Sequence, residues 1–225
     1  MAPGLTIDIT EKRFPAATTP VFAHFQLSLE PGSVTALLGP SGVGKSTLLR
    51  LIAGIDTDYA GTIRIGDTSA QNAPPPGMVF QDARLLPWLN ALDNIRLAAP
   101  DLPAETAHTA LAGVGLADQA NAWPRTLSGG MQRRVALARA LCTNADLLLL
   151  DEPFVSLDPA LVADMHRLLA AHMARTGATV LFTTHQAHDA ESLATRIITF
   201  DGHPAQIVSD VRAEPRPYPA PPAAV

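Results

Sequence analysis

The sequence contains a single cysteine, Cys142, so an intrachain disulfide framework is excluded. Cys142 ends an apolar helical segment, where we interpret it as a small buried hydrophobic residue. Long hydrophobic runs are also missing, because the strongest, Leu147 to Leu150, is far too short to cross a bilayer. The stretch from Met1 to Thr10 lacks the basic and apolar regions of a secretory signal. We therefore expect a soluble chain that reaches a membrane only through a partner.

An excess of positive charge is missing too. The 16 Lys and Arg residues are outnumbered by 21 Asp and Glu residues, which gives a net charge of -5. A mildly acidic chain lacks the basic charge of a non-specific nucleic-acid binder, and we expect no nucleic-acid partner. The length of 225 residues suits one α/β domain with an inserted lobe, or two small lobes. Either is long enough to bury a sizeable core.

The glycine-rich segment GPSGVGKST is the most informative feature that is present. It fits the phosphate-binding pattern G-x-x-x-x-G-K-[ST] and lies between a predicted buried strand at 34–38 and a predicted helix at 47–53. The backbone N–H groups of such a loop surround a polyphosphate, helped by the helix N-terminus. Lys45 is expected to reach the β- and γ-phosphates, and Ser46 to bind Mg²⁺. The predicted nucleotide-binding residues are Gly39, Pro40, Ser41, Gly42, Val43, Gly44, Lys45, Ser46 and Thr47.

A pair of carboxylates follows a second apolar strand, Leu147 to Leu150. A buried strand of this kind delivers Asp151 and Glu152 to the edge of the sheet. We expect Asp151 to hold Mg²⁺ opposite Ser46, mostly through water. Glu152 is expected to orient and deprotonate the attacking water, since two adjacent acids suit direct general-base hydrolysis.

Strand and helix patterns alternate along most of the chain. Strands at 34–38, 78–80, 147–150 and 179–183 alternate with helices, which predicts a mostly parallel sheet with helices on both faces. Strand signals vanish from 81 to 127, and helical patterns appear near 91–97 and 104–114. We predict an ATP-binding core at 1–80 and 128–211, an inserted helical lobe at 81–127, and a proline-rich, disordered tail at 212–225.

A second pair of glycines precedes another helix, in Ser128-Gly129-Gly130. Their N–H groups and the helix dipole form a second anion site, and the serine hydroxyl adds a donor. One ATP already has its phosphate loop. A second cradle in the same chain suggests that it contacts the γ-phosphate bound by another copy. The motif thus predicts a head-to-tail homodimer that encloses two ATP molecules.

Taken together, these ordered motifs resemble the nucleotide-binding subunit of an ABC transporter, over about residues 5–211. The resemblance implies a RecA-like P-loop NTPase fold of the α/β class, with a mostly parallel sheet, an N-terminal antiparallel β element and an inserted helical lobe. It implies ATP and Mg²⁺ as cofactors, and ATP hydrolysis coupled to transport. It also implies an integral membrane permease as partner, an external solute-binding protein as an indirect partner, and a peripheral location on the cytoplasmic face of the membrane.

Further site residues follow from this resemblance. Gln81 matches the Q-loop glutamine that contacts Mg²⁺ and water and transmits lobe rotation, and His185 matches the switch histidine near the γ-phosphate. Asp158, in Ser156-Leu157-Asp158, matches the D-loop and also caps the helix that follows. The other histidines are interpreted as structural. Met131 stands where the family usually has glutamine after the signature glycines, which puts a polar contact from that side chain in doubt.

The family also stacks an aromatic ring on adenine. Phe14 is the candidate from its place after the first strand, with Phe22 as the second and a core role for Phe14 as the alternative.

The segment QDARLLPW, which begins at Gln81, resembles importer subunits for nitrate, aliphatic sulfonates and taurine. Leu85 and Trp88 either line the groove that receives a short helix of the membrane subunit or pack the lobe itself. Thiamine-precursor import is the nearest alternative. A soluble ABC ATPase that acts on DNA or ribosomes is the alternative from another class.

Overall fold

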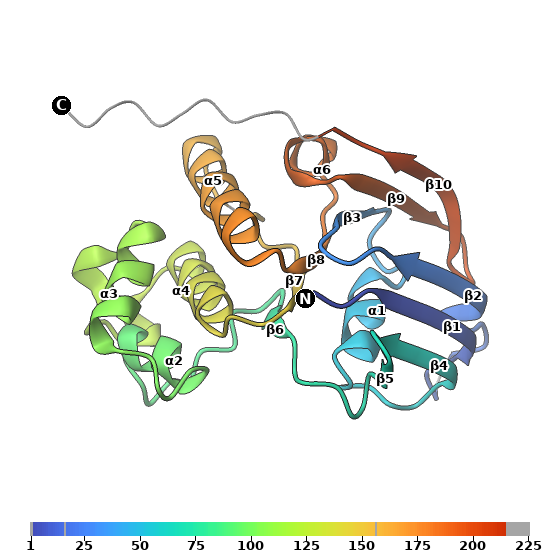
Figure 1. Ribbon diagram of the computed structural model, residues 1–225, viewed down its shortest axis with the longest axis horizontal. Coiled ribbons are helices and arrows are strands. Elements are labelled where there is room, and N and C mark those ends of the chain that lie inside the picture. The colour runs from blue at the N-terminus through green and yellow to red at the C-terminus, as the bar shows by residue number, and fades with distance from the viewer. Residues whose placement is uncertain (1, 16, 156, 215–225) are drawn as a thin grey trace.

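The computed structural model describes residues 2–15, 17–155 and 157–214, and Figure 1 shows two sheets at one end of the molecule and a group of helices at the other. The first sheet is antiparallel, in the order β2-β1-β4-β5. Its strands are β1 (Leu5–Lys12), β2 (Phe22–Leu29), β4 (Ala60–Ile65) and β5 (Thr68–Ser69). Alternate residues of β1 are buried because only one face of this sheet meets the core.

The second sheet carries the functional loops. Its order is β10-β9-β3-β8-β7-β6, and every neighbouring pair is parallel except β9 with the edge strand β10. All residues of β7 and β8 are buried, as expected of central strands with helices on both faces. The bounds are β3 (Val34–Leu38), β6 (Gly77–Val79), β7 (Leu147–Asp151), β8 (Thr179–Thr183), β9 (Arg196–Asp201) and β10 (Gln206–Arg212).

Helix α1 (Lys45–Ile52) packs between the two sheets. Four of its leucine and isoleucine side chains are buried in a core that also takes residues of β1, β2 and β4. The opposite face of the second sheet is covered by α4 (Gly129–Cys142), α5 (Pro159–Thr176) and α6 (Ala187–Leu193). This packing fixes the position of the segment that joins β3 to α1.

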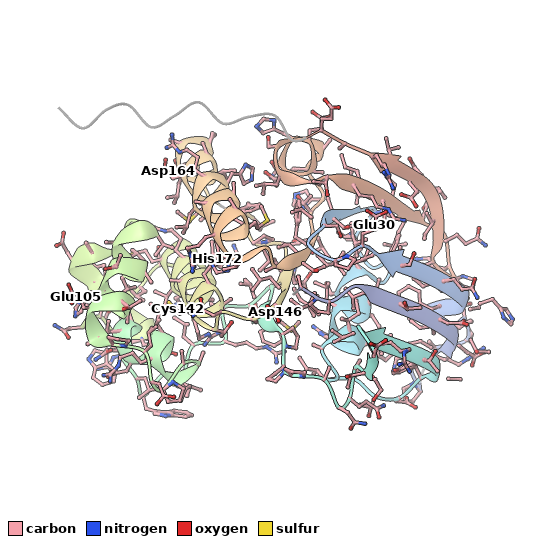
Figure 2. The ribbon with its side chains drawn as sticks, viewed as in Figure 1. Glu30, Glu105, Cys142, Asp146, Asp164 and His172 are labelled. Atoms are coloured by element: carbon pink, nitrogen blue, oxygen red, sulfur yellow. The ribbon has the colours of Figure 1, made fainter. Side chains whose placement is uncertain are left out.

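Helices α2 (Ala91–Leu97) and α3 (Ala104–Gly113) pack against each other and against α4, away from the sheets (Figure 1). Glu105 on α3 lies at this outer end (Figure 2). The predicted α/β fold with an antiparallel N-terminal element and a helical insertion is confirmed. The boundaries of the lobe at 81 and 127 stay a prediction.

Most predicted elements agree with the structure to within a few residues. Three short ones were not predicted: β5 and the 3-10 helices at Ala117–Gln119 and Pro124–Thr126. Strand β2 begins at Phe22 rather than at Phe25, with consequences for the site described below. Cys142 is buried at the end of α4, as predicted, and burial raises the pKa of its thiol. Figure 2 shows it between α3 and the sheets.

Within the described part of the chain, no helix combines the length and the apolar character needed to cross a membrane. Residues 212–214 of the predicted tail lie in or directly after β10, so the prediction of disorder is wrong for Arg212, which pairs with Arg196 in the sheet. Positions 215–225 of the tail, and Ser156 of the predicted D-loop, lie outside the described residues.

Candidate nucleotide-binding and hydrolysis site

Four parallel neighbours of the second sheet, in the order β3-β8-β7-β6, end at one edge of that sheet. Each is followed by a predicted site segment: the phosphate loop after β3, Glu152 after β7, His185 soon after β8, and Gln81 soon after β6. Ligands of open α/β sheets bind at the carboxyl ends of the strands. The topology thus gathers residues that are more than a hundred positions apart in the sequence.

The phosphate loop leads directly into α1, whose N-cap is Gly44. Gly44 has φ +117, and a Cβ there would lie 2.7 Å from the side chain of Val21. Gly42 also has positive φ, but a Cβ there would meet nothing within 4 Å. Gly44 therefore serves the turn and its packing, whereas Gly42 leaves open the surface that an anion approaches at the N-terminus of α1.

Lys45 is 6% exposed, and its Nζ donates to the carbonyl oxygens of Gly39 at 2.6 Å and Pro40 at 2.9 Å. Burial lowers the pKa of Lys45, while the nearby carboxylates of Glu152 and Asp151 act in the opposite direction. The ammonium is thus held within the loop, where a phosphate would take over its hydrogen bonds.

Asp151 is nearly fully buried and accepts two hydrogen bonds at the same oxygen. The Ser46 hydroxyl donates to Oδ1 at 2.9 Å, and the Thr183 hydroxyl donates to it at 2.8 Å. The predicted juxtaposition of Ser46 and Asp151 is therefore present in the geometry. Thr183 has no counterpart in the sequence-based site, because nothing in a run of buried strand residues marks one hydroxyl as a ligand of a carboxylate.

Glu152 adopts φ +49, a left-handed conformation that is unfavourable for a residue with a side chain. Its N–H donates to the Thr183 hydroxyl at 2.9 Å, which helps to hold this strained turn. Its carboxylate lies 3.8 Å from Nδ1 of His185, whose side chain is about half exposed. Backbone strain of this kind is concentrated at functional sites. Glu152 lies on the wall of a cavity that the phosphate loop also lines, whereas His185 does not.

Gln81 lies on the wall of the same cavity as the phosphate loop. Its carbonyl oxygen accepts a long hydrogen bond, 3.4 Å, from Nε of Arg133, and the same guanidinium donates to the carbonyl of Val155 at 2.8 Å. Arg133 on α4 therefore connects the segment after β6 with the segment that leads to Asp158. No sequence pattern indicates this link, because both acceptors are backbone atoms.

The cavity has a volume of about 650 Å³ and is lined by the loop between β1 and β2 of the first sheet and by segments that follow strands of the second. Phe14 lies on its wall and is 40% exposed, whereas Phe22 is fully buried and packs on Phe25 with ring centroids 4.8 Å apart. Phe22 is thus a core residue, and Phe14 stays the predicted partner of adenine. His203, which we interpreted as structural, also lies on the wall. It follows β9, where no motif indicates a ligand.

The phosphate loop contributes unequally to this cavity. Val43 is a core residue with 1% exposure, so only its backbone can reach a ligand. Gly39 and Pro40 face Lys45 through their carbonyl oxygens rather than the cavity. The loop residues on the cavity wall are Ser41, Gly42, Gly44, Lys45, Ser46 and Thr47.

The second glycine pair lies elsewhere. Ser128 caps α4 by accepting from the N–H of Met131 at 3.2 Å, and Asp158 caps α5 by accepting from the N–H of Leu161 at 3.0 Å. None of the residues Ser128, Gly129, Gly130 and Asp158 lies on the cavity wall. A Cβ at Gly129 would meet nothing within 4 Å, so this surface is open. The chain therefore does not bring its two glycine motifs together within one copy.

The residues around Ser46 suit a magnesium ion. The Ser46 hydroxyl and the Asp151 carboxylate already meet at 2.9 Å, and Gln81 lies with Ser46 on the cavity wall. Mg²⁺ prefers such oxygen ligands and binds through one or two carboxylates together with phosphates. Within 2–15, 17–155 and 157–214, no group of three or more His, Cys, Asp or Glu side chains could hold a metal by itself. The donor set thus fits Mg²⁺ that arrives with a nucleotide.

Comparison with protein families finds a match to the family described as ABC transporter, over residues 22–155. The chain is 46% identical over 191 residues to the "Aliphatic sulfonates import ATP-binding protein SsuB" of Albidiferax ferrireducens, covering 84% of this chain and 68% of that protein. It is 41% identical over 223 residues to "Aliphatic sulfonates import ATP-binding protein SsuB 1" of Xanthomonas axonopodis pv. citri, covering 95% and 88%.

Solved structures give the same result for the fold. The ATP-binding cassette MJ0796, in a dimeric structure of a post-hydrolysis state bound to ADP and Pi, superposes with a TM-score of 0.84. The two sequences are 26% identical, and the match covers 93% of this chain and 99% of the other. A second structure of MJ0796, described as a dimeric bacterial ABC transporter cassette, matches equally well.

Proposed function

The chain belongs to the ABC transporter family of ATPases, and we propose that it is the ATP-hydrolysing subunit of a bacterial importer for aliphatic sulfonates. The observation that carries the hydrolytic part of this proposal is the convergence of Lys45, Asp151 and Glu152 at one edge of the parallel sheet. The proposed substrate, an aliphatic sulfonate, rests on the names of the relatives. The nitrate, taurine and thiamine-precursor alternatives are separated from it by experiment below.

In the proposed reaction, the phosphate loop binds the triphosphate through its backbone N–H groups and the Lys45 ammonium. Ser46, Asp151 and Gln81 would hold Mg²⁺, which neutralises charge on the phosphates. Glu152 orients the attacking water and takes up its proton. Its carboxylate is held by a strained backbone and lies beside His185. His185 donates to the γ-phosphate and helps to keep Glu152 in place.

The site of one copy is completed by a second copy. The glycine motif at Ser128 is open and is absent from the wall of its own cavity. In a head-to-tail dimer, Ser128, Gly129, Gly130 and Asp158 of each copy face the nucleotide held by the other. The structures of MJ0796 are described as dimeric, which supports the formation of a dimer. The hydroxyl of Ser128 and the first N–H groups of α4 then contact the γ-phosphate.

The membrane subunit docks on the helical part of the molecule. Trp88 is 67% exposed, whereas Leu85 packs against the buried cluster of α2–α4. This division favours Trp88 for contact with a membrane partner and a core role for Leu85, because exposed aromatic residues are typical anchors of interfaces. An external solute-binding protein delivers the cargo on the other side of the membrane. The chain then sits peripherally at the cytoplasmic face.

The cargo is tested by growth. A strain that lacks this gene should grow on sulfate but not on an alkanesulfonate as sole sulfur source, and the wild-type gene should restore growth while Glu152→Gln does not. Parallel plates with taurine, with nitrate as nitrogen source, or without thiamine separate the alternatives. A defect on one of those plates, with normal growth on the alkanesulfonate, would refute the sulfonate assignment.

The chemistry is tested with purified protein. Glu152→Gln should retain ATP affinity and lose turnover by about 10²-fold or more, since a general base contributes roughly 10²–10⁴. It should also accumulate as an ATP-dependent dimer, measured by size-exclusion chromatography with light scattering.

The partner is tested by a pull-down from native membranes. With Glu152→Gln as bait, an integral membrane protein should be retained. Recovery of ribosomal or DNA-repair proteins instead would support the soluble class.

A further inference from the structure

Lys12 is an unusual residue at the end of β1. Its side chain is 2% exposed, and it is one of only two lysines in the chain, the other being Lys45 of the phosphate loop. Its Nζ donates to Oδ1 of Asp56 at 2.9 Å and to the carbonyl oxygen of Asp58 at 2.6 Å. Both acceptors lie between α1 and β4, so the ammonium is anchored on a segment next to the core.

The third partner of this ammonium is an aromatic ring. The Nζ atom lies 4.9 Å from the ring centroid of Phe14, within the range of a cation–π interaction. An ammonium has three N–H donors, and two are used by Asp56 and Asp58. The remaining proton is available to the ring. Because Lys12 is buried, this contact is shielded from water and is stronger than at an exposed site.

The Phe14 ring contacts both the nucleotide cavity and the Lys12 ammonium. The ring lies on the wall of the nucleotide cavity and is 40% exposed, whereas Lys12 does not lie on that wall. The ammonium therefore contacts the ring from the protein side. The loop that carries Phe14 is closed at its base by a hydrogen bond from the N–H of Val21 to the carbonyl of Lys12, 2.7 Å long.

We propose that Lys12 is a positioning residue for the nucleotide base: its buried ammonium fixes the Phe14 ring from behind, so that the free face of the ring is presented to adenine. This inference rests on the proposed role of Phe14 in ATP binding. It assigns no contact between Lys12 and the nucleotide. Lys12 acts through the ring. Because the ammonium already restricts the Phe14 side chain in the free protein, less conformational entropy is lost when a base stacks on the ring.

The experiment separates the base from the phosphates. Calorimetry with Mg²⁺ measures the affinities of ATP and of inorganic tripolyphosphate for the full chain and for Phe14→Ala, Lys12→Met and the double variant. Loss of a stacked base costs about 5-fold or more in affinity. We expect that loss for Phe14→Ala with ATP and about 3-fold for Lys12→Met. Neither variant should change tripolyphosphate binding, and Lys12→Met should have no further effect once Phe14 is alanine.

Asp56→Asn is the matched control. It removes the nearer of the two carboxylates beside Lys12, since Asp58 Oδ2 also lies 3.7 Å from Nζ, and it leaves the ammonium beside the ring. ATP affinity should therefore stay within about 2-fold of wild type. Thermal unfolding checks that each variant is folded. Should Lys12→Met fail to fold because Asp56 is left unpaired, the double variant Lys12→Met, Asp56→Asn is measured in its place, since it removes the ammonium together with its nearer carboxylate.

The outcomes distinguish the two claims. Unchanged ATP affinity in Phe14→Ala would overturn the role of Phe14 itself. A weakened Phe14→Ala together with an unaffected Lys12→Met would overturn the positioning role alone. The positioning role is also overturned if Asp56→Asn lowers the affinity for ATP as much as Lys12→Met does, or if Lys12→Met also lowers the affinity for tripolyphosphate. In either case Lys12 would stabilise the fold around the site rather than position the ring.

Discussion

Thr183 joins the carboxylate of Asp151 to the backbone of Glu152 through one buried hydroxyl. It is fully buried at the end of β8, directly opposite Asp151 of β7 in the parallel register. The hydroxyl donates to Oδ1 of Asp151 at 2.8 Å and accepts from the N–H of Glu152 at 2.9 Å. The substitution Thr183→Val keeps the shape of the side chain and removes only this hydroxyl, so no cavity is formed.

The cost follows from the two hydrogen bonds. A hydrogen bond to a charged group contributes about 1.5–3 kcal/mol, and a buried N–H left without a partner costs about 1–3 kcal/mol. Because Val replaces the hydroxyl by a methyl group that is well buried, we expect Thr183→Val to lower the free energy of unfolding by about 2–5 kcal/mol. ATP turnover should fall by about 10-fold or more, since the strained backbone of Glu152 loses a support and small displacements of catalytic groups are costly.

Urea unfolding and steady-state ATP hydrolysis measure the two effects, with Thr183→Ser as the matched control. The serine variant keeps the hydroxyl and removes a methyl group, so its loss of stability should be about 0.5–1.5 kcal/mol with near-normal turnover. If Thr183→Val proves as stable and as active as Thr183→Ser, the hydroxyl does not hold the Asp151 carboxylate and the Glu152 backbone in place.

Three further predictions concern single side chains. Phe22→Ala should lower the free energy of unfolding by about 3–5 kcal/mol in urea unfolding, because Phe22 is fully buried, whereas Phe14→Ala should cost less than about 1 kcal/mol. Burial and nearby Arg175 lower the pKa of His172, so the unfolded chain binds the proton more readily than the folded chain. The free energy of unfolding should therefore fall as the pH drops below about 6.5. In unfolding curves measured at several pH values, His172→Gln should reduce this dependence on pH. The Cys142 thiol, whose pKa is raised by burial, should react with iodoacetamide only after unfolding, as followed by mass spectrometry; labelling of the native chain at the unfolded rate would contradict its burial.

The sequence was sufficient for the parts of the site that lie in contiguous motifs. The glycine pattern before Lys45 and the apolar run before Asp151 place their residues at strand ends, because strand, loop and helix are local choices. The parallel sheet followed from the alternation of these elements. The structure then brings Ser46 and Asp151 together, as expected from two loops at the same edge of one sheet.

What could not be predicted depends on contacts between distant elements. Lys12 looks like the exposed end of an alternating strand, yet it is buried because Asp56 and Asp58 come to it from another loop. His203 carries no motif and reaches the cavity only because the β9–β10 turn folds toward the phosphate loop. The choice between Phe14 and Phe22 depended on where β2 begins, and strand boundaries are the weakest part of a sequence-based prediction.

The central claim is that each ATP is hydrolysed at a site built from two copies of the chain. Lys45→Ala disables the phosphate loop and keeps Ser128, whereas Ser128→Arg disables the second glycine motif and keeps the phosphate loop. Each variant alone should be inactive. In an equal mixture, half of the dimers are mixed and each has one intact composite site, so ATP turnover should recover to about one quarter of the wild-type value. A mixture that stays as inactive as its components, or a Ser128→Arg variant that hydrolyses ATP at the wild-type rate by itself, would contradict the shared site.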